Sequence, residues 1–252
     1  MSNEFKNELA KNVVGKPSAL LGDWISSALY LRAHGKIEKA NDLKAGYETR
    51  RKAFEKLVIE NIELIPADFF REPTMQQIAG TLEAAASCLE ENPLWEMFAA
   101  LLASSFDSRK DVHPSFANTL KNLSPLDAAN FLLFDDAEGA LPVVKYIANY
   151  SDRPNDEFIY DVFLSNRDEQ NIKIQSMSLG NLKRCQLIEI DYHSHVGGDE
   201  KYVNFLDENI TSQISNDVKS IPTFTELSYL KGRAYPTSYG IAFFLACQRP
   251  DD

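Results

Sequence analysis

The sequence has no run of about 18 consecutive apolar residues, the length that a membrane-spanning helix needs. Its first residues, MSNEFKNELAKNV, also lack the basic start and apolar stretch of a secretion signal. Cysteine is scarce, with three in 252 residues and wide spacing between them. A disulfide framework is therefore disfavoured, and reduced, buried thiols are expected. These absences together predict a cytoplasmic protein without membrane contact.

Familiar catalytic motifs are missing as well. The sequence contains no GxGxxG or GxxxxGKS/T loop for phosphates, no GxSxG, no HExxH and no CxxC. We therefore expect no cofactor, and we favour a binding function over an enzymatic one. Acidic pairs such as Asp135-Asp136 leave a metal-dependent effector enzyme as an alternative.

Acidic residues are present in excess, with 37 Asp and Glu against 26 Lys and Arg, a net charge of −11. Residues 1–123 carry 15 basic against 17 acidic side chains, and the remainder carries 11 against 20. The excess disfavours general binding to nucleic acid or anionic lipid. Because the charge balance and the residue pattern both change near Ser124, we predict domains 1–123 and 124–252.

The first part has helical periodicity throughout. Helices are predicted at Ser18–His34, Ile37–Ile62, Thr74–Glu90 and Pro93–Phe106. The last of these is apolar on nearly every side, which is typical of the buried centre of a helical bundle. The second helix carries a basic patch of Arg50, Arg51, Lys52 and Lys56. This patch could bind a partner or phosphate, or form a solvated face balanced by neighbouring glutamates.

The second part mixes helices and strands. Helices are predicted at 124–134, 157–164, 178–184 and 239–248, and strands at 141–147, 186–191 and 228–235. This order is that of a winged helix with an insertion between its two wing strands. The fold class predicted for the whole chain is mainly α with a small β component (α+β): an N-terminal helical bundle followed by a winged-helix-like domain.

Several motifs resemble those of the Abi-alpha family. They are Arg71-Glu72-Pro73, the segment Leu94 to Asp107, Val112-His113-Pro114-Ser115-Phe116, Leu123-Ser124-Pro125, Leu179-Gly180-Asn181 and Pro236 to Phe243. The resemblance covers roughly residues 55 to 248, with Cys185-Gln186 standing where the family more often has Leu-Gly. It implies a prokaryotic protein linked to abortive infection, a form of phage defence. It implies no catalytic mechanism.

Candidate functional residues fall into three groups. Lys183 and Arg184 end the predicted recognition helix, while Lys231 and Arg233 lie on the second wing strand. A second candidate is His113, which precedes a proline and can offer a ring nitrogen to a ligand or bond to a neighbour. The third group is Asp191, His193 and His195, which alternate along a strand end and could converge on a metal ion. Solvated histidines at a turn are the competing interpretation.

Three function classes follow from these observations. The favoured one is a non-enzymatic, intracellular protein-interaction module linked to phage defence, with a protein partner. The first alternative is a winged-helix DNA-binding regulator, which the acidic second part disfavours because phosphate contacts need Lys and Arg. The second alternative is the metal-dependent effector enzyme. Self-association through the long helix from Ile37 also remains open.

Overall fold

The computed structural model describes residues 41–88, 92–135, 139–152, 156–166, 168–169 and 171–250. Contacts divide the chain into two compact units, one of Met1–Pro125 with Ala242–Asp252 and one of Leu126–Ile241. The helix predicted at Ser18–His34 lies outside the described residues. The boundary predicted between residues 123 and 124 stays a prediction from sequence.

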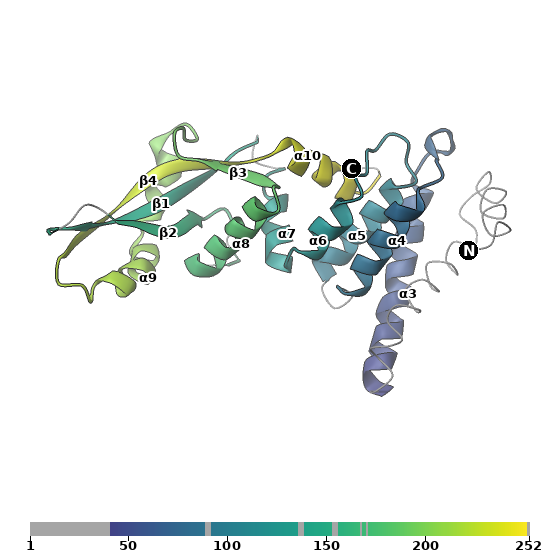
Figure 1. Ribbon diagram of the computed structural model, residues 1–252, viewed down its shortest axis with the longest axis horizontal. Coiled ribbons are helices and arrows are strands. Elements are labelled where there is room, and N and C mark those ends of the chain that lie inside the picture. The colour runs from purple at the N-terminus through teal and green to yellow at the C-terminus, as the bar shows by residue number, and fades with distance from the viewer. Residues whose placement is uncertain are drawn as a thin grey trace. The chain divides into compact units, whose positions relative to one another are not determined.

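The first unit is built from helices over its described residues (Figure 1). They are α3 (Asn41–Glu63), η1 (Ala67–Phe69), α4 (Met75–Ala86), α5 (Asn92–Ser104) and α6 (Phe116–Lys121). α5 contacts α3, α4 and α6. Its side chains from Met97 to Ala103 are all buried. The prediction that this apolar helix forms the centre of the bundle is confirmed, because a helix without a polar face has to be covered on every side.

Local capping and a late segment complete the first unit. Thr74 and Gln77 form a reciprocal capping box at the start of α4. Residues 242–250 come from the far end of the described chain, yet they pack against these helices. The ring of Phe243 meets that of Phe116 edge-on, with 5.6 Å between centroids. The first unit is therefore closed by chain that follows the second unit.

The second unit combines a sheet with helices. Its elements are α7 (Pro125–Leu132), β1 (Leu141–Tyr150), β2 (Asp156–Phe163), α8 (Ile172–Arg184), β3 (Ile188–Asp191), η2 (Asp199–Leu206), α9 (Glu208–Val218), β4 (Phe224–Pro236) and α10 (Ser238–Cys247), the last of which crosses the division between units. The sheet order is β2-β1-β4-β3, and every pair is antiparallel. The long strand β4 is central and pairs with both β1 and β3. The predicted pairing of the two late strands is confirmed.

The helix predicted at 157–164 is wrong, because this segment is strand β2. β2 pairs antiparallel with β1, and Val162 lies opposite Val144. Both valines are fully buried. The segment is rich in aromatic and β-branched residues, which fit a half-buried pleated surface. Pairing with β1 therefore overrides the helical spacing of its apolar residues.

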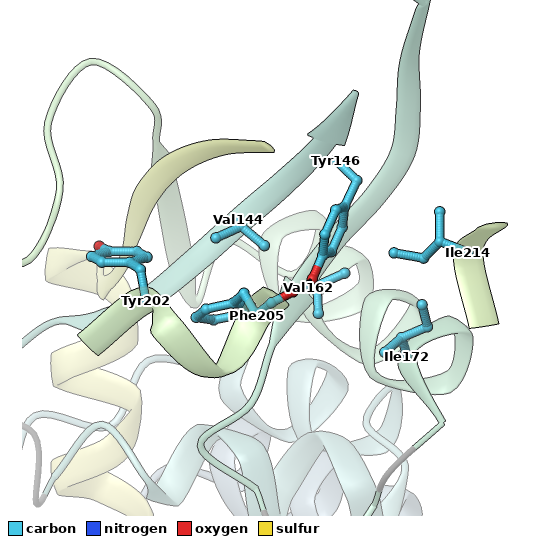
Figure 2. Packing of buried hydrophobic residues seen from close by; sticks show 7 residues of the cluster. All are labelled: Val144, Tyr146, Val162, Ile172, Tyr202, Phe205 and Ile214. Carbon is cyan, nitrogen blue, oxygen red and sulfur yellow. Dashed lines mark hydrogen bonds between the residues drawn. The ribbon is translucent and has the colours of Figure 1, made fainter. Parts of the chain in front are cut away.

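The hydrophobic core of the second unit lies between the sheet and the segments that follow β2 and β3. Figure 2 shows its buried cluster of Val144, Tyr146, Val162, Ile172, Tyr202, Phe205 and Ile214. The two buried tyrosines have partners for their hydroxyl groups. Tyr146 donates to the carbonyl oxygen of Phe205, and Tyr202 donates to that of Gly232 at 2.7 Å. A buried hydroxyl without such a partner would destabilise the core.

Taken together, the described elements are mainly helical with one small antiparallel sheet, so the chain is an α+β protein. Among the helices that the structure describes, none combines the length and apolarity needed to cross a membrane.

Candidate functional site

Five of the candidate residues fall in one region of the second unit, around the β3–β4 pair. Asp191 ends β3 and lies opposite Arg233 of β4 in the antiparallel register. Lys231 lies two residues before Arg233, so both side chains leave the same face of the strand. His193 and His195 belong to the loop that follows β3. The strand pairing thus gathers charges that are about forty residues apart in the sequence.

The carboxylate of Asp191 is occupied by donors of its own loop. One oxygen accepts the His193 backbone N–H at 2.8 Å, and the other accepts the Ser194 hydroxyl. Arg233 Nε lies 3.5 Å from the second oxygen. The bonds from Ser194 and His193, together with the charge of Arg233, hold the pKa of Asp191 below its usual value. The loop therefore uses this carboxylate as a structural acceptor.

The metal site predicted from Asp191, His193 and His195 does not form in this arrangement. Across the described residues, no group of three or more His, Cys, Asp or Glu side chains is placed to hold a metal ion. The cause is local: Asp191 turns back to its own loop, and the ring of His195 packs edge-on against Tyr202 instead, with 6.1 Å between centroids. The alternation expected of a strand ends at Asp191.

Lys231 is matched by a carboxylate in the same region. Its Nζ lies 2.6 Å from Asp199 Oδ1 and also sits over the Tyr202 ring, 5.5 Å from the centroid. The ion pair raises the pKa of Lys231 and lowers the pKa of Asp199. With Arg233 beside Asp191, the two cations of this strand each have an acidic neighbour. The region therefore offers a phosphate little unbalanced positive charge.

Tyr192 is a part of this region that the sequence did not indicate. Its hydroxyl donates to Asp161 of β2, and Lys145 Nζ of β1 lies 4.8 Å from its ring centroid. The ring passes so close to Gly232 of β4 that a Cβ there would lie 2.6 Å from it. This one side chain, which follows β3 directly, thus contacts residues of the other three strands. The glycine between Lys231 and Arg233 is required by this contact.

The predicted recognition helix, α8, presents Lys183 and Arg184 in its last turn. Both side chains are exposed. Arg184 Nη2 and Nε donate to Asn181 Oδ1 at 2.7 and 3.0 Å, and Asn181 donates in turn to the buried carboxylate of Asp127 at 2.7 Å. Within the part of the chain that the structure describes, neither cation forms an ion pair. These are the candidate cations whose charge is available to a partner.

The end of α8 is a Schellman motif. The Gln186 N–H donates to the Lys183 carbonyl at 2.9 Å, and the Leu187 N–H donates to the Leu182 carbonyl at 3.0 Å. Gln186 has φ 60°, in the left-handed region. Glycine reaches that region without strain, so it would fit this position better than glutamine does.

The family-like segment from Pro236 to Phe243 also has a structural role. Leu187 O accepts the Thr237 N–H at 3.0 Å, and the Thr237 hydroxyl caps α10 by accepting the Gly240 N–H at 2.8 Å. A Cβ at Gly240 would lie 2.0 Å from Leu187 O. The Thr-Ser-Tyr-Gly segment therefore fixes the start of α10 against the end of α8.

α8 begins earlier than the sequence indicated, at Ile172 instead of Ser178, with Asn171 as its N-cap. The extra turns add Ile174 and Met177 to its surface, with 42% and 74% of their area exposed. Residues 171–177 mix polar and apolar side chains, so the sequence did not predict this part of the helix. Neither side chain was a sequence candidate.

A buried amide network ties α8 to α7. Asn130 Nδ2 donates to Gln175 Oε1 and to Ser178 Oγ, both at 2.9 Å. Its Oδ1 accepts Asn166 Nδ2 at 2.7 Å. Because Asn130 is fully buried, each of these bonds replaces water that the amide gave up on folding. We assign this network a structural role.

In the first unit, the family-like motifs meet around Asp107. This carboxylate is fully buried and is held by the neighbouring Arg109, whose Nη2 lies 2.7 Å and Nε 3.0 Å from its oxygens. The Arg109 backbone N–H also donates to it at 2.9 Å. Burial by itself raises the pKa of Asp107, but the bonds and charge of Arg109, with the charge of Lys110, outweigh it and leave the pKa lowered.

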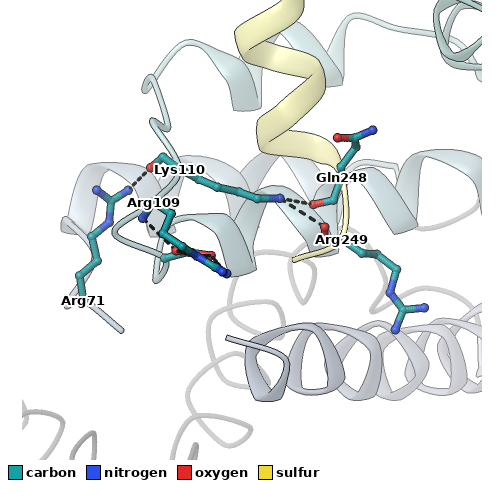
Figure 3. Close-up of polar contacts among 6 residues, drawn as sticks. Arg71, Arg109, Lys110, Gln248 and Arg249 are labelled. Carbon is teal, nitrogen blue, oxygen red and sulfur yellow. Dashed lines mark hydrogen bonds and ion pairs between the residues drawn. The ribbon is translucent and has the colours of Figure 1, made fainter. Parts of the chain in front are cut away.

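Arg71 and Lys110 hold backbone carbonyls in the same region, as Figure 3 shows. Arg71 donates to the carbonyls of Ser105 and Lys110 at 3.1 and 2.8 Å. Lys110 Nζ donates to the carbonyl of Gln248 at 2.9 Å. The Arg-Glu-Pro motif thus anchors the loop after α5, and that loop anchors residues after α10.

His113 has a local role. Its Nδ1 accepts the Ser115 backbone N–H at 3.2 Å and lies 2.7 Å from the Ser115 hydroxyl. The ring lies 6.0 Å from that of Phe116. The residue is exposed, and these contacts hold the turn that precedes α6.

The basic patch predicted on α3 is only partly exposed, at Lys52 and Lys56. Arg51 is buried, and its guanidinium lies 2.9 Å from Glu48 and 2.7 Å from Glu55 on the same helix. Arg50 is half-buried beside it. The structure therefore places Arg51 in an ion-pair ladder.

The family model described as Abortive infection alpha (Abi_alpha) matches residues 46–247. The chain belongs to this family. Comparison with curated proteins and with solved structures gave no match. The match runs through both units, so the Abi-alpha region contains the Asp107 contacts, the whole of α8 and the capping segment before α10.

Proposed function

We propose that this Abi-alpha chain acts in abortive infection as a non-enzymatic protein-interaction module in the prokaryotic cytoplasm. Family membership supports the link to abortive infection. The observation that carries the binding role is the pairing of candidate cations with carboxylates of the same chain. Lys231 with Asp199 is the closest such pair in the second unit, at 2.6 Å.

The same pairing argues against nucleic acid as the principal ligand. A phosphate-binding surface gains most of its affinity from Lys and Arg side chains that displace counterions from the nucleic acid. A Lys or Arg that is already paired with a carboxylate contributes less. Of the candidate cations in the second unit, Lys183 and Arg184 are exposed and have no ion pair among the described residues. Residues 124–252 carry 11 basic against 20 acidic side chains. So few unpaired candidate cations in an acidic unit favour a protein partner over DNA.

We also propose a winged-helix-like relationship for α8, β3 and β4. Its support is the order of a helix followed by an antiparallel strand pair, with η2 and α9 inserted between the strands. The strand β2 stands where a winged helix would carry a further helix. Winged helices bind proteins as well as DNA, so the binding role rests on the surface charges and not on this likeness.

Phage challenge of cells expressing the full chain tests the proposal. We expect lower plating efficiency than with an empty vector, together with in-cell crosslinks from the chain to a protein. A chain lacking protection against every phage tested would contradict the link to abortive infection. Protection with crosslinks to nucleic acid alone would contradict the protein-interaction role.

A further inference from the structure

The solvent face of α8 carries an apolar surface that stays exposed among the described residues. α8 packs against β2 and β3 (Figure 1) and buries Gln175, Leu179 and Leu182. The opposite face presents Met177 at its centre, with 74% of its area exposed, and Ile174 at its border. Exposed methionine is typical of surfaces that bind protein helices, because its flexible side chain adapts to a partner.

Gly180 lies one turn after Met177 on the same face. It is exposed, its φ is not in the left-handed region, and a Cβ there would meet nothing within 4 Å. Glycine inside a helix costs about 1 kcal/mol relative to alanine. Among the described residues nothing requires that cost, unlike at Gly240, where a Cβ would strike Leu187 O. A glycine on an open face lets the backbone of another molecule approach closely.

The charge of this face is opposite to that of the chain. Lys173 and Arg184 lie on the stripe with Met177, and Lys183 borders it. Lys173 sits 5.9 Å from the ring centroid of Tyr160, and neither Lys183 nor Arg184 has a carboxylate partner among the described residues. Cations in the last turn of a helix also interact favourably with the helix dipole, which offers another explanation for Lys183 and Arg184. That explanation does not account for the exposed Met177 or for Gly180.

We propose that the exposed face of α8, centred on Met177 and Gly180, docks an amphipathic helix of a partner protein whose apolar stripe is flanked by Asp and Glu. This inference rests on the proposed protein-interaction function and names its surface. Small residues at a helix contact allow close packing of two axes, and the basic border selects an acidic partner.

The two competing occupants fit this face less well. A second copy would bring the same Lys and Arg side chains together across a two-fold axis, and like charges there are unfavourable. DNA would meet Met177 at the centre of the contact and few unpaired cations around it. An acidic amphipathic helix satisfies both the apolar centre and the basic border.

The test uses two displayed libraries of helical peptides of equal length. Both carry apolar residues at i, i+3, i+4 and i+7, with Glu-rich flanks in one and Lys-rich flanks in the other. The full chain is the bait, and affinities of enriched peptides are measured by fluorescence anisotropy. We expect enrichment from the acidic library. Gly180→Gln should weaken binding about tenfold or more, as should Lys183→Glu with Arg184→Glu.

Matched controls remove an exposed apolar group or charge elsewhere. Val203→Ser and Lys219→Glu change exposed residues of η2 and the end of α9, and they should leave peptide affinity unchanged. Gly180→Gln keeps a good helix former, so its far-ultraviolet circular dichroism should match that of the parent. Equal loss in the control variants would overturn the proposal.

Other results overturn the inference alone. One such result is enrichment of basic peptides, or no enrichment at all. Another is a short DNA duplex that competes with the peptide for the chain. A third is a concentration-dependent dimer of the chain that Gly180→Gln abolishes. If Gly180→Gln folds and phage protection with protein crosslinks persists, the α8 site is wrong while the proposed function stands. If acidic peptides bind α8 but the parent chain gives no protection, the docking site stands and the role in abortive infection fails.

Discussion

Gln186 shows at the scale of one residue how a left-handed position at a helix end can be held without glycine. It holds φ 60° at the end of α8 while its N–H and that of Leu187 still close the Schellman motif. The hydrogen bonds of the motif use only backbone atoms, so they survive the loss of glycine. The strain of a left-handed side chain remains as a cost of about 1 kcal/mol.

Replacing this residue with glycine should therefore stabilise the protein. We expect Gln186→Gly to raise the free energy of unfolding by about 1 kcal/mol, measured by urea denaturation. Gln186→Ala keeps the strain and should show no such gain. An unchanged or lower stability in the glycine variant would contradict the strain argument.

Two other glycines should respond in opposite directions to alanine. Gly180→Ala adds a methyl group where nothing lies within 4 Å, so we expect about 0.5–1 kcal/mol of added stability. Gly240→Ala places a methyl group against Leu187 O, so we expect a loss of about 3 kcal/mol. Thermal unfolding of both variants checks the pair, and shifts of the same sign would contradict it.

The carboxylate of Asp107 should give the protein acid sensitivity. Its pKa is lower in the folded chain than in the unfolded one, so its stabilising contribution is complete above the unfolded value near 3.9 and is lost as the pH falls through the folded pKa. We expect Asp107→Asn to cost about 2 kcal/mol at pH 7 and to flatten the fall in stability between about pH 5 and 3.

Urea denaturation at several pH values measures this effect. Asp111→Asn, which removes an exposed carboxylate nearby, controls for the loss of one negative charge. Parallel stability profiles for Asp107→Asn and the parent chain would show that Arg109 does not hold the carboxylate as described.

At the scale of elements, sequence patterns located the helices and strands whose period was unambiguous. The all-apolar α5 and the late strands β3 and β4 were predicted for that reason. β2 was not, because Phe158, Ile159, Val162 and Phe163 fit helical spacing while the alternating set from 158 to 164 fits a strand equally well. Only the pairing with β1 decides between the two.

The candidate site was predictable to a smaller degree. Sequence identified Lys231, Arg233 and Asp191 as charged positions, yet their pairing depends on the register of β3 with β4 and on a loop that returns Asp199. η2 and α9 escaped prediction because residues 199–218 are rich in Asn, Ser and Asp, which have low helix propensity. Instead, η2 and α9 are stabilised because their side chains Tyr202 and Ile214 are buried in the core of the second unit.

The amide network between α7 and α8 yields an element-scale prediction. Asn130→Ala would leave Gln175, Ser178 and Asn166 without their buried partner, so we expect a loss of about 2–3 kcal/mol. Asn122→Ala removes an exposed side-chain bond and should cost less than about 0.5 kcal/mol. Equal effects in chemical denaturation would contradict a structural role for the buried network.

At the scale of the whole molecule, the acidic excess and the internal ion pairs act in the same direction. The net charge of −11 repels nucleic acid, and the cations nearest the β3–β4 pair are matched by Asp191 and Asp199. Both effects weaken the long-range attraction that guides a protein to DNA. The proposed winged-helix relationship therefore does not predict DNA binding here.

We expect weak, nonspecific DNA binding in a gel-shift titration at about 150 mM salt. Lys183→Glu with Arg184→Glu should change retention little, while the same change at Lys121 and Lys219 serves as the control. Sequence-specific retention that disappears only in the α8 variant would favour the DNA-binding regulator.

The contact between Lys110 and Gln248, 138 residues apart, has a consequence for synthesis of the chain. At about 5–20 residues per second, a ribosome needs roughly 7–30 s to pass from one residue to the other. The second unit is synthesised during that interval, while Phe116 still lacks the ring of Phe243. Until residues 242–250 are translated, the nascent helical unit therefore presents apolar surface that a chaperone can hold.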